Sequence, residues 1–326
     1  MTTGVSALLS RAEELVGRGR GGEARLLLEN AGQHGDASAW FQLAIWSLVG
    51  SPIPRDLSKA RRYLRQAVEI GHVDAALMEV ALTANGTGAA PDWRLALERL
   101  TVAARDDPVA AEQLALLNQM ALDAQGQPLS TPEAERLGQA PEVLRYPALL
   151  TAAECAHIAQ AAQELLEPST VIDPRTRRAI PHPVRSSHHA ALGPTRETLP
   201  TQAVLRRVAA ITGTAVAQGE PLTVLCYRPG DQYLPHHDAL PGARNQRVKT
   251  VLLYLNDGYE GGETEFLNNR LKVRGRPGDA IAFDNVHPDG QPDLLSRHAG
   301  LPVRRGSKWL ATRWIRAAPY DPWTAS

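Results

Sequence analysis

Small and apolar side chains recur at a fixed spacing from residue 1 to about residue 125. Four positions repeat every 36 residues in three copies: Ala24, Ala60 and Ala96; Leu28, Leu64 and Leu100; Ala31, Ala67 and Ala103; and Ala39, Ala75 and Ala111. The first three positions are spaced i, i+4 and i+7, which places them on one face of a helix. This period predicts stacked helix pairs, with alanines where the helices approach closely.

Turn-forming residues separate the copies, as Ser-Pro-Ile-Pro at residues 51–54 and Gly-Thr-Gly at residues 86–88. The region resembles tetratricopeptide and Sel-like repeats, although its glycine pattern between helices is degenerate. Two interpretations stay open. The repeats either pack on the neighbouring domain and stabilise it, or they form a concave surface that recruits a peptide or protein substrate.

Breakers at residues 125–132, Gln-Gly-Gln-Pro-Leu-Ser-Thr-Pro, are typical of a domain boundary, and a short helix is expected at 132–137. We therefore expect an α-helical repeat domain at residues 1–125, a linker at 126–140 and a second domain at 141–326.

The second domain opens with helices and continues with strands. Thr151 and Glu154 form a capping-box pattern for a helix to about residue 167, and another helix is expected at 201–211. From residue 222 onward, β-rich runs alternate with turns that contain Gly and Pro. The run 222–227 is strand-like, and the clearest strands are 248–255, 280–283 and 308–315. This alternation is what a jelly roll, or double-stranded β-helix, with flanking helices requires.

Composition narrows the possible partners and the compartment. The 326 residues carry 35 basic and 35 acidic side chains, which gives no electrostatic reason to expect nucleic acid or an anionic membrane. Cys155 and Cys226 lie far apart and fit a reducing compartment better than a disulfide framework. Residues 1–9 lack a signal-peptide pattern, and no run of eighteen apolar residues occurs. These features predict a cytoplasmic protein without a membrane partner.

Candidate chemistry begins at His236-His237-Asp238, just after the predicted strand 222–227. Side chains alternate on an extended backbone, so His236 and Asp238 share a face and His237 points the other way. With a second histidine from elsewhere, the pair would make the 2-His-1-carboxylate triad that holds non-haem Fe(II).

A second candidate group lies on the last predicted strand. Lys308, Leu310, Thr312 and Trp314 alternate onto one face of it, and His298 precedes it. A lysine that faces inward needs an anionic partner, because an unpaired buried ammonium is very costly. The distal carboxylate of 2-oxoglutarate is a suitable partner.

Six motifs resemble the prolyl 4-hydroxylase branch of the Fe(II)/2-oxoglutarate oxygenases. They are Tyr-Arg-Pro-Gly at 227–230, Tyr-x-x-His-x-Asp at 233–238, Arg247 with Thr250 and Tyr-Leu-Asn at 254–256, Gly-Gly-Glu-x-x-Phe at 261–266, Pro-Gly-Asp-Ala at 277–280 with Phe283, and residues 298–314. The resemblance covers roughly residues 141 to 318 and also implies a jelly roll. The segment 239–246 is short for the family, which leaves the shape of a peptide groove open.

The resemblance implies a role for nine residues. It makes His236, Asp238 and His298 the Fe(II) ligands and catalytic residues, and Lys308 the anchor of the 2-oxoglutarate distal carboxylate. Tyr227 and Thr264 match positions near the co-substrate, and Tyr233, Arg247 and Trp314 match positions that hold a peptide. We interpret the other histidines nearby as loop residues, because they lack the sequence context of His298: His182, His188, His189 and His287.

These residues predict a dioxygenase that uses Fe(II), 2-oxoglutarate and O₂, with ascorbate as a reductant, and hydroxylates a peptidyl residue, foremost proline. One alternative is hydroxylation of a free amino acid or small metabolite. Another is a non-catalytic, repeat-based interaction protein whose second domain senses iron and 2-oxoglutarate. The complete candidate ligand set favours an enzyme, and the repeats favour a macromolecular target.

Overall fold

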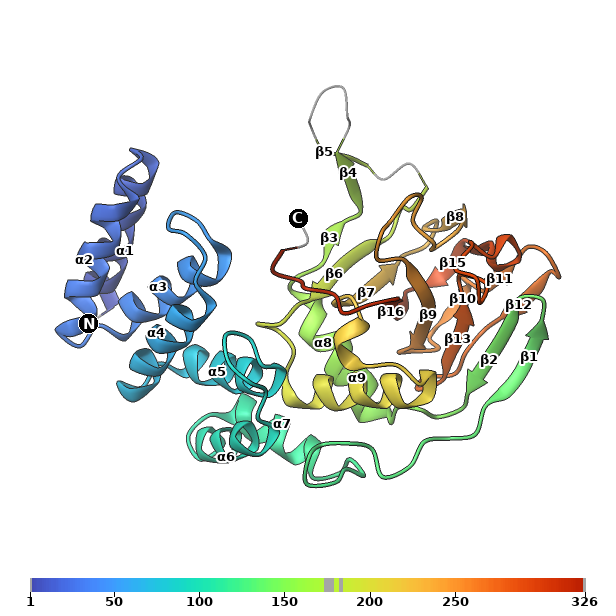
Figure 1. Ribbon diagram of the computed structural model, residues 1–326, viewed down its shortest axis with the longest axis horizontal. Coiled ribbons are helices and arrows are strands. Elements are labelled where there is room, and N and C mark those ends of the chain that lie inside the picture. Colours follow the sequence, from blue (N-terminus) through green and yellow to red (C-terminus); the bar gives the residue numbers. More distant parts are fainter. Residues whose placement is uncertain (1, 173–178, 182–183, 325–326) are drawn as a thin grey trace. The chain divides into compact units, whose positions relative to one another are not determined.

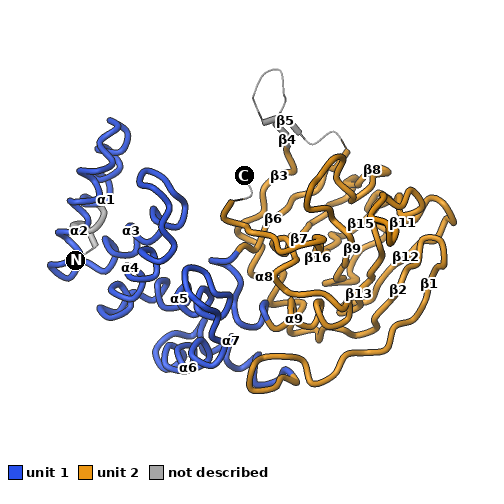
Figure 2. Tube along the Cα trace, in the orientation of Figure 1, with its two compact units in different colours: residues 1–120, 194–202 blue, residues 121–193, 203–326 orange. Residues whose placement is uncertain are grey.

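The computed structural model describes residues 2–172, 179–181 and 184–324. His182, interpreted above as a loop residue, lies outside these ranges. The chain divides into two compact units (Figure 2), one holding residues up to Met120 with Pro194–Gln202, the other Ala121–Gly193 with Ala203–Ser326. No helix among the described residues is long and apolar enough to cross a bilayer.

The first unit consists of paired helices, as the 36-residue period predicts. Its described helices are α1 (Thr2–Gly17), α2 (Gly21–Gln33), α3 (Ala37–Val49), α4 (Leu57–Glu69), α5 (Val73–Asn85), α6 (Trp93–Ala103) and α7 (Pro108–Leu117). The repeated alanine and leucine positions on α2, α4 and α6 are fully buried at Ala24, Leu28, Ala60, Leu64, Ala96 and Leu100. Asp56 and Asp92, themselves 36 residues apart, cap the N-termini of α4 and α6. The 36-residue period therefore indicates both which face of these helices is buried and where α4 and α6 begin.

The segment Pro194–Gln202 joins this unit although it is distant in sequence. The Asn85 side-chain amide donates to the Pro194 carbonyl at 2.9 Å, and the Gln202 amide donates to the Ala81 carbonyl at 3.0 Å. These hydrogen bonds use polar groups near the end of α5.

The second unit begins with a strand where a helix was expected. Residues 132–137 do not form the predicted short helix; instead β1 (Glu135–Gln139) pairs antiparallel with β2 (Glu142–Tyr146). β2 is in turn hydrogen-bonded to β13, so this hairpin extends a large sheet. Pairing across the sheet outweighs the weak local helix preference of a six-residue segment.

Two helices have the predicted positions. α8 (Ala152–Gln163) starts with the capping box of Thr151 and Glu154, and α9 (Leu199–Thr212) contains the expected 201–211. α8 ends four residues earlier than predicted, and short strands follow it: β3 (Glu167–Pro168), β4 (Thr170–Ile172), β5 (Ala179–Pro181) and β6 (His188–Leu192).

The remaining strands form the jelly roll. An eight-stranded sheet has the order β1-β2-β13-β9-β16-β7-β6-β3, and a four-stranded sheet has the order β12-β11-β14-β8. Their bounds are β7 (Leu222–Tyr227), β8 (Tyr233–His236), β9 (Arg247–Tyr254), β11 (Thr264–Phe266), β12 (Leu271–Val273), β13 (Ala280–Asp284), β14 (His298–Gly300) and β16 (Lys308–Arg316). A further pair, β10 (Tyr259–Gly261) and β15 (Val303–Gly306), lies outside these two sheets.

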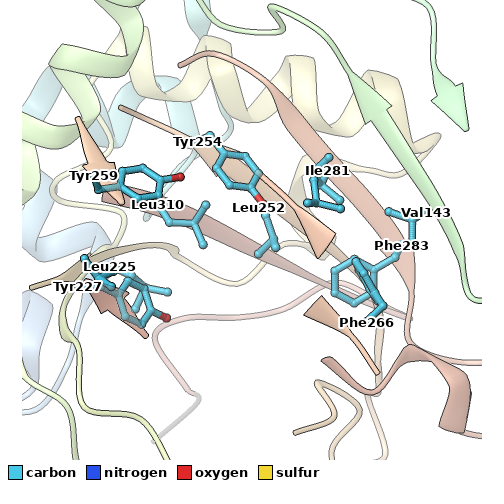
Figure 3. Close-up of a cluster of buried hydrophobic side chains, with 12 residues drawn as sticks. Val143, Leu225, Tyr227, Leu252, Tyr254, Tyr259, Phe266, Ile281, Phe283 and Leu310 are labelled. Carbon is cyan, nitrogen blue, oxygen red and sulfur yellow. The ribbon is translucent and has the colours of Figure 1, made fainter. Parts of the chain in front are cut away.

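One buried cluster fills the space between the sheets (Figure 3). Phe266 and Phe283 meet edge to face, with ring centroids 5.0 Å apart, and the cluster extends to Tyr227 and Tyr254. Gly278 allows the turn that leads into β13, because it has φ +88° and an added Cβ would lie 2.1 Å from the Leu150 carbonyl oxygen. The core thus fixes β8, β11, β14 and β16, whose polar side chains converge at one site.

Candidate active site

Three candidate ligands converge where β8 meets β14. His236 ends β8, Asp238 follows it, and His298 begins β14 directly opposite His236 in the antiparallel register. One potential ligand atom from each residue lies within 4.8 Å of the other two, and no other such group of three occurs among the described residues. His236 Nε2 lies 3.7 Å from Asp238 Oδ1, and His298 Nε2 lies 3.8 Å from Asp238 Oδ2. The three side chains enclose a space of the size that a metal ion takes.

Backbone contacts orient both imidazole rings in the same way. The Nδ1 atom of His236 lies 2.8 Å from the Leu234 carbonyl oxygen, and that of His298 lies 3.0 Å from the Ser296 carbonyl oxygen. A neutral imidazole whose Nδ1 donates to a carbonyl presents the lone pair of Nε2. Burial, together with the neighbouring His298, lowers the pKa of His236, which keeps its ring in the neutral form that binds metals.

Asp238 is held by a chain of hydrogen bonds from β9. Thr250 Oγ1 donates to Asp238 Oδ2 at 2.6 Å, and Asn285 Nδ2 donates to Thr250 Oγ1 at 2.9 Å. Burial alone would raise the pKa of this carboxyl, but His298, His236 and the Thr250 hydroxyl bring it below its usual value. Asp238 is therefore a carboxylate whose orientation is fixed by the Thr250 hydroxyl, as suits a metal ligand.

The neighbouring histidines lie apart from this group. His237 is not part of the cluster, in keeping with strand alternation. His287 Nε2 is 3.7 Å from Asp293 Oδ1, and His188 and His189 lie on β6, where they pair with Pro168 and Glu167.

Lys308 supplies a buried cation beside the same pocket. Its side chain is 2% exposed, and Nζ donates to the Gly262 carbonyl at 2.7 Å. Nζ also lies 5.6 Å from the centre of the Tyr227 ring and 5.5 Å from that of Tyr254. Among the described residues no carboxylate lies within ion-pair distance of Nζ, and burial lowers the pKa of Lys308 to about 8 against the opposing effect of the Glu263 carboxylate. An anionic ligand would satisfy this ammonium.

A single pocket of about 30 Å³ connects Lys308 with the histidines and Asp238. The sequence suggested roles for nine residues. Eight of them line this pocket: Tyr227, Tyr233, His236, Asp238, Thr264, His298, Lys308 and Trp314. Arg247 is the exception.

Arg247 contacts the pocket wall through Trp314. Its guanidinium is 4.0 Å from the centre of the Trp314 ring and forms a two-point ion pair with Glu220 at 2.6 and 2.7 Å. The indole Nε1 of Trp314 is buried without a hydrogen-bond partner. The Tyr233 ring stacks on His236 with centroids 3.5 Å apart. Arg247 thus contacts the lining of the pocket rather than the pocket itself.

Sequence reasoning assigned no role to Tyr254 and Thr250, although both occur in the quoted motifs. The Tyr254 hydroxyl lies 3.0 Å from Thr264 Oγ1, close to the Lys308 ammonium, and Thr250 holds Asp238. Alternation along β9 puts Thr250, Leu252 and Tyr254 on one face, and Leu252 lines the pocket. The alternation of side chains along β9 could have identified both Thr250 and Tyr254 from the sequence.

Comparisons with known proteins agree with this geometry. A model of the 2OG-Fe(II) oxygenase superfamily matches residues 222–316. Prolyl 4-hydroxylase 1 of Arabidopsis thaliana is 33% identical over 201 residues, which cover 56% of this chain and 71% of that protein. The chain belongs to the 2OG-Fe(II) oxygenase superfamily, within the family of prolyl 4-hydroxylases. It is a dioxygenase that uses Fe(II), 2-oxoglutarate and O₂.

Two solved structures are also similar to the chain. The viral collagen prolyl hydroxylase of Paramecium bursaria Chlorella virus-1, in its 2-oxoglutarate complex, is 25% identical with a TM-score of 0.45, and the match covers 54% of this chain and 96% of that one. A Sel1 repeat protein from Oxalobacter formigenes is 25% identical with a TM-score of 0.30, over 34% of this chain and 87% of that one.

Proposed function

We propose that this chain hydroxylates proline residues in a protein target, with the metal and the co-substrate held by the residues of the single pocket. The observation that carries the proposal is the placement of Lys308, a buried cation without a carboxylate partner in the described chain, in the same pocket as two oriented imidazoles and a carboxylate. A dicarboxylic acid that reaches from the metal to the ammonium satisfies both ends.

In this proposal, His236, Asp238 and His298 hold the iron through Nε2 of each ring and a carboxylate oxygen. Lys308 pairs with the distal carboxylate of 2-oxoglutarate, and the hydroxyls of Tyr254 and Thr264 lie beside it. Bound iron and 2-oxoglutarate, together with O₂ as the oxidant, would supply the chemistry that replaces a C–H hydrogen with a hydroxyl group. The chain's part is to orient the ligands, to keep the site dry and to present the substrate.

Tyr233 and Trp314 both line the pocket, and the Tyr233 ring stacks on that of His236 with centroids 3.5 Å apart. We assign substrate contact to Tyr233 and Trp314, with Arg247 as a positioning residue that Glu220 holds against the Trp314 ring.

Incubation of the purified chain with Fe(II), 2-oxoglutarate and proline-containing peptides tests the proposal. We expect succinate and a +16 Da product on proline residues, and neither with the His236→Ala variant. Free proline and other amino acids serve as competing substrates. Hydroxylation of a free amino acid, without any product on peptides, would contradict the proposal. The absence of any 2-oxoglutarate turnover would favour a sensing or interaction role instead.

A further inference from the structure

The helical unit contains a groove that is not part of the candidate active site. A groove of about 610 Å³ runs along α4, α5 and α6 to the start of α7. Every residue that lines it belongs to the helical unit. We call this feature the α4–α7 groove.

Aliphatic side chains in the α4–α7 groove are open to solvent. Val73 of α5 is 54% exposed, and Leu95 and Val102 of α6 are 37% and 58% exposed. On α6, Leu95 and Val102 lie away from the buried positions Ala96 and Leu100. Exposed apolar residues gathered in one hollow, and edged by charge, are typical of a protein interaction site.

Carboxylates dominate the charge of the groove. Glu69, Glu98 and Asp106 are exposed and form no ion pair within the described residues. Asp107 uses Oδ1 to accept the Val109 backbone N–H at 3.0 Å, while its Oδ2 is buried without a hydrogen-bond partner. Asp107 therefore adds negative charge to the lining but offers no accessible acceptor at Oδ2.

The positive charges of the groove are directed at one buried acid. Arg99 lies 2.6 Å and Arg65 3.8 Å from Glu79, which also pairs with the buried Arg61. His72 accepts the Ala75 backbone N–H on its ring, and burial lowers the pKa of His72, so it adds no charge near neutral pH. The lining therefore holds five carboxylates against two guanidinium groups, and those two are already engaged.

We propose that the α4–α7 groove docks a basic segment of a partner protein, in which aliphatic side chains alternate or intersperse with lysine or arginine. The aliphatic side chains cover Val73, Leu95 and Val102, and the cations meet the exposed carboxylates of Glu69, Glu98 and Asp106. Charge complementarity of this kind selects the partner and speeds association. The proposal concerns binding alone, so it does not depend on proline being the hydroxylated residue.

Fluorescence anisotropy with the full-length protein tests the docking. The probe is a labelled twelve-residue peptide of alternating lysine and leucine, and its counterpart carries glutamate in place of lysine. We expect saturable binding of the lysine peptide that weakens with added salt, and none of the glutamate peptide. No detectable binding of the lysine peptide would overturn the proposal.

Matched variants locate the site. Glu98→Lys with Asp106→Lys should weaken binding roughly tenfold or more, since two rim charges are reversed. Glu13→Lys with Glu112→Lys makes the same change in net charge at exposed residues outside the groove and should leave binding unchanged. Equal losses in both pairs would mean that the probe senses only overall charge, and the docking site would be rejected.

A second pair of variants tests the aliphatic side chains of the α4–α7 groove without changing the charge of the protein. Val102→Gln should weaken binding several-fold, whereas Val49→Gln, at a residue 57% exposed and outside the groove, should not. Circular dichroism confirms that each variant is folded.

Concentration-dependent dimerisation that Val102→Gln abolishes, with peptide binding unaffected, would show a second copy as the occupant and overturn the proposal. Succinate production without peptide present should be the same in all four variants, so a failure of docking is distinct from a failure of catalysis.

Discussion

His236 and His298 face each other across one antiparallel register of the four-stranded sheet, with ring centroids 4.3 Å apart. They are 62 positions apart in the sequence, and the pairing of β8 with β14 brings their Nε2 atoms to the same carboxylate. A shift of this register by one residue would turn one of the two rings to the other face of the sheet. The ligand geometry therefore depends on strand pairing, which the core around Phe266 and Phe283 secures.

The first prediction separates the three histidines. His236→Ala or His298→Ala should abolish Fe(II) binding and succinate production, because each removes one of three metal ligands. His237→Ala should keep most of both, since its ring lies outside the ligand group. Calorimetric titration with Fe(II) under anaerobic conditions, together with a succinate assay, measures the two effects. A similar loss of Fe(II) affinity in all three variants would refute the ligand assignment.

Much of the site could be predicted from local pattern. Strand alternation separated His236 and Asp238 from His237, and it placed Lys308 and Trp314 on an inward face. Alternation along one strand does not predict which strands pair or in which register, because pairing depends on contacts between segments that are distant in the sequence. The Glu220 and Arg247 ion pair is such a contact, because it joins residues 27 positions apart.

The same limit explains the error in the linker region. Residues 132–137 have the proline and the charges of a helix start, but β1 has a partner in β2, and β2 has one in β13. The 36-residue period predicted its helices more reliably than the local pattern at residues 132–137 did, because the same buried helix face recurs in three copies. Conversely, nothing local indicates that Asn85 and Gln202 bind backbone groups of segments more than a hundred residues away.

The second prediction concerns the ammonium of Lys308. Lys308→Ala should raise the 2-oxoglutarate concentration needed for half-maximal activity by two orders of magnitude or more, because loss of one partner of a buried pair costs roughly 3–5 kcal/mol. Fe(II) affinity should change little. Lys308→Arg should restore only part of the affinity, because the planar guanidinium is longer and differently shaped. Lys272→Ala, at an exposed lysine on β12, is the control. An unchanged requirement in Lys308→Ala would move the anchor elsewhere.

The third prediction is a pH dependence of 2-oxoglutarate binding. Burial lowers the pKa of Lys308 to about 8, so the free protein loses this ammonium as the pH rises through 8. A bound carboxylate favours the protonated form, so binding above pH 8 must take up a proton. The half-saturating 2-oxoglutarate concentration should be level between pH 7 and 7.5 and rise about tenfold per pH unit above 8.

Titration calorimetry in two buffers of different ionisation enthalpy measures the proton uptake directly. Lys308→Arg should bind more weakly at pH 7 but show a flat profile to pH 9.5, because the guanidinium keeps its proton. A profile for Lys308→Arg that rises as steeply as that of the unaltered protein would assign the proton to another group.

The last prediction concerns the support of Asp238 by Thr250. Thr250→Val keeps the shape of the side chain but removes the hydroxyl that donates to Asp238 at 2.6 Å and accepts from Asn285 at 2.9 Å. Two buried groups then lack a partner, and the free energy of unfolding should fall by about 1–3 kcal/mol. Without its fixed orientation, the carboxylate should bind Fe(II) about 10–100-fold more weakly.

Thr250→Ser separates the two effects, because it keeps the hydroxyl and loses only a methyl group at a fully buried position. It should lose some stability yet retain Fe(II) affinity close to that of the unaltered protein. Urea unfolding and anaerobic Fe(II) titration of both variants give the comparison. If Thr250→Val bound Fe(II) as tightly as Thr250→Ser, the hydroxyl would act only in packing, and the orientation of Asp238 would have to come from the metal itself.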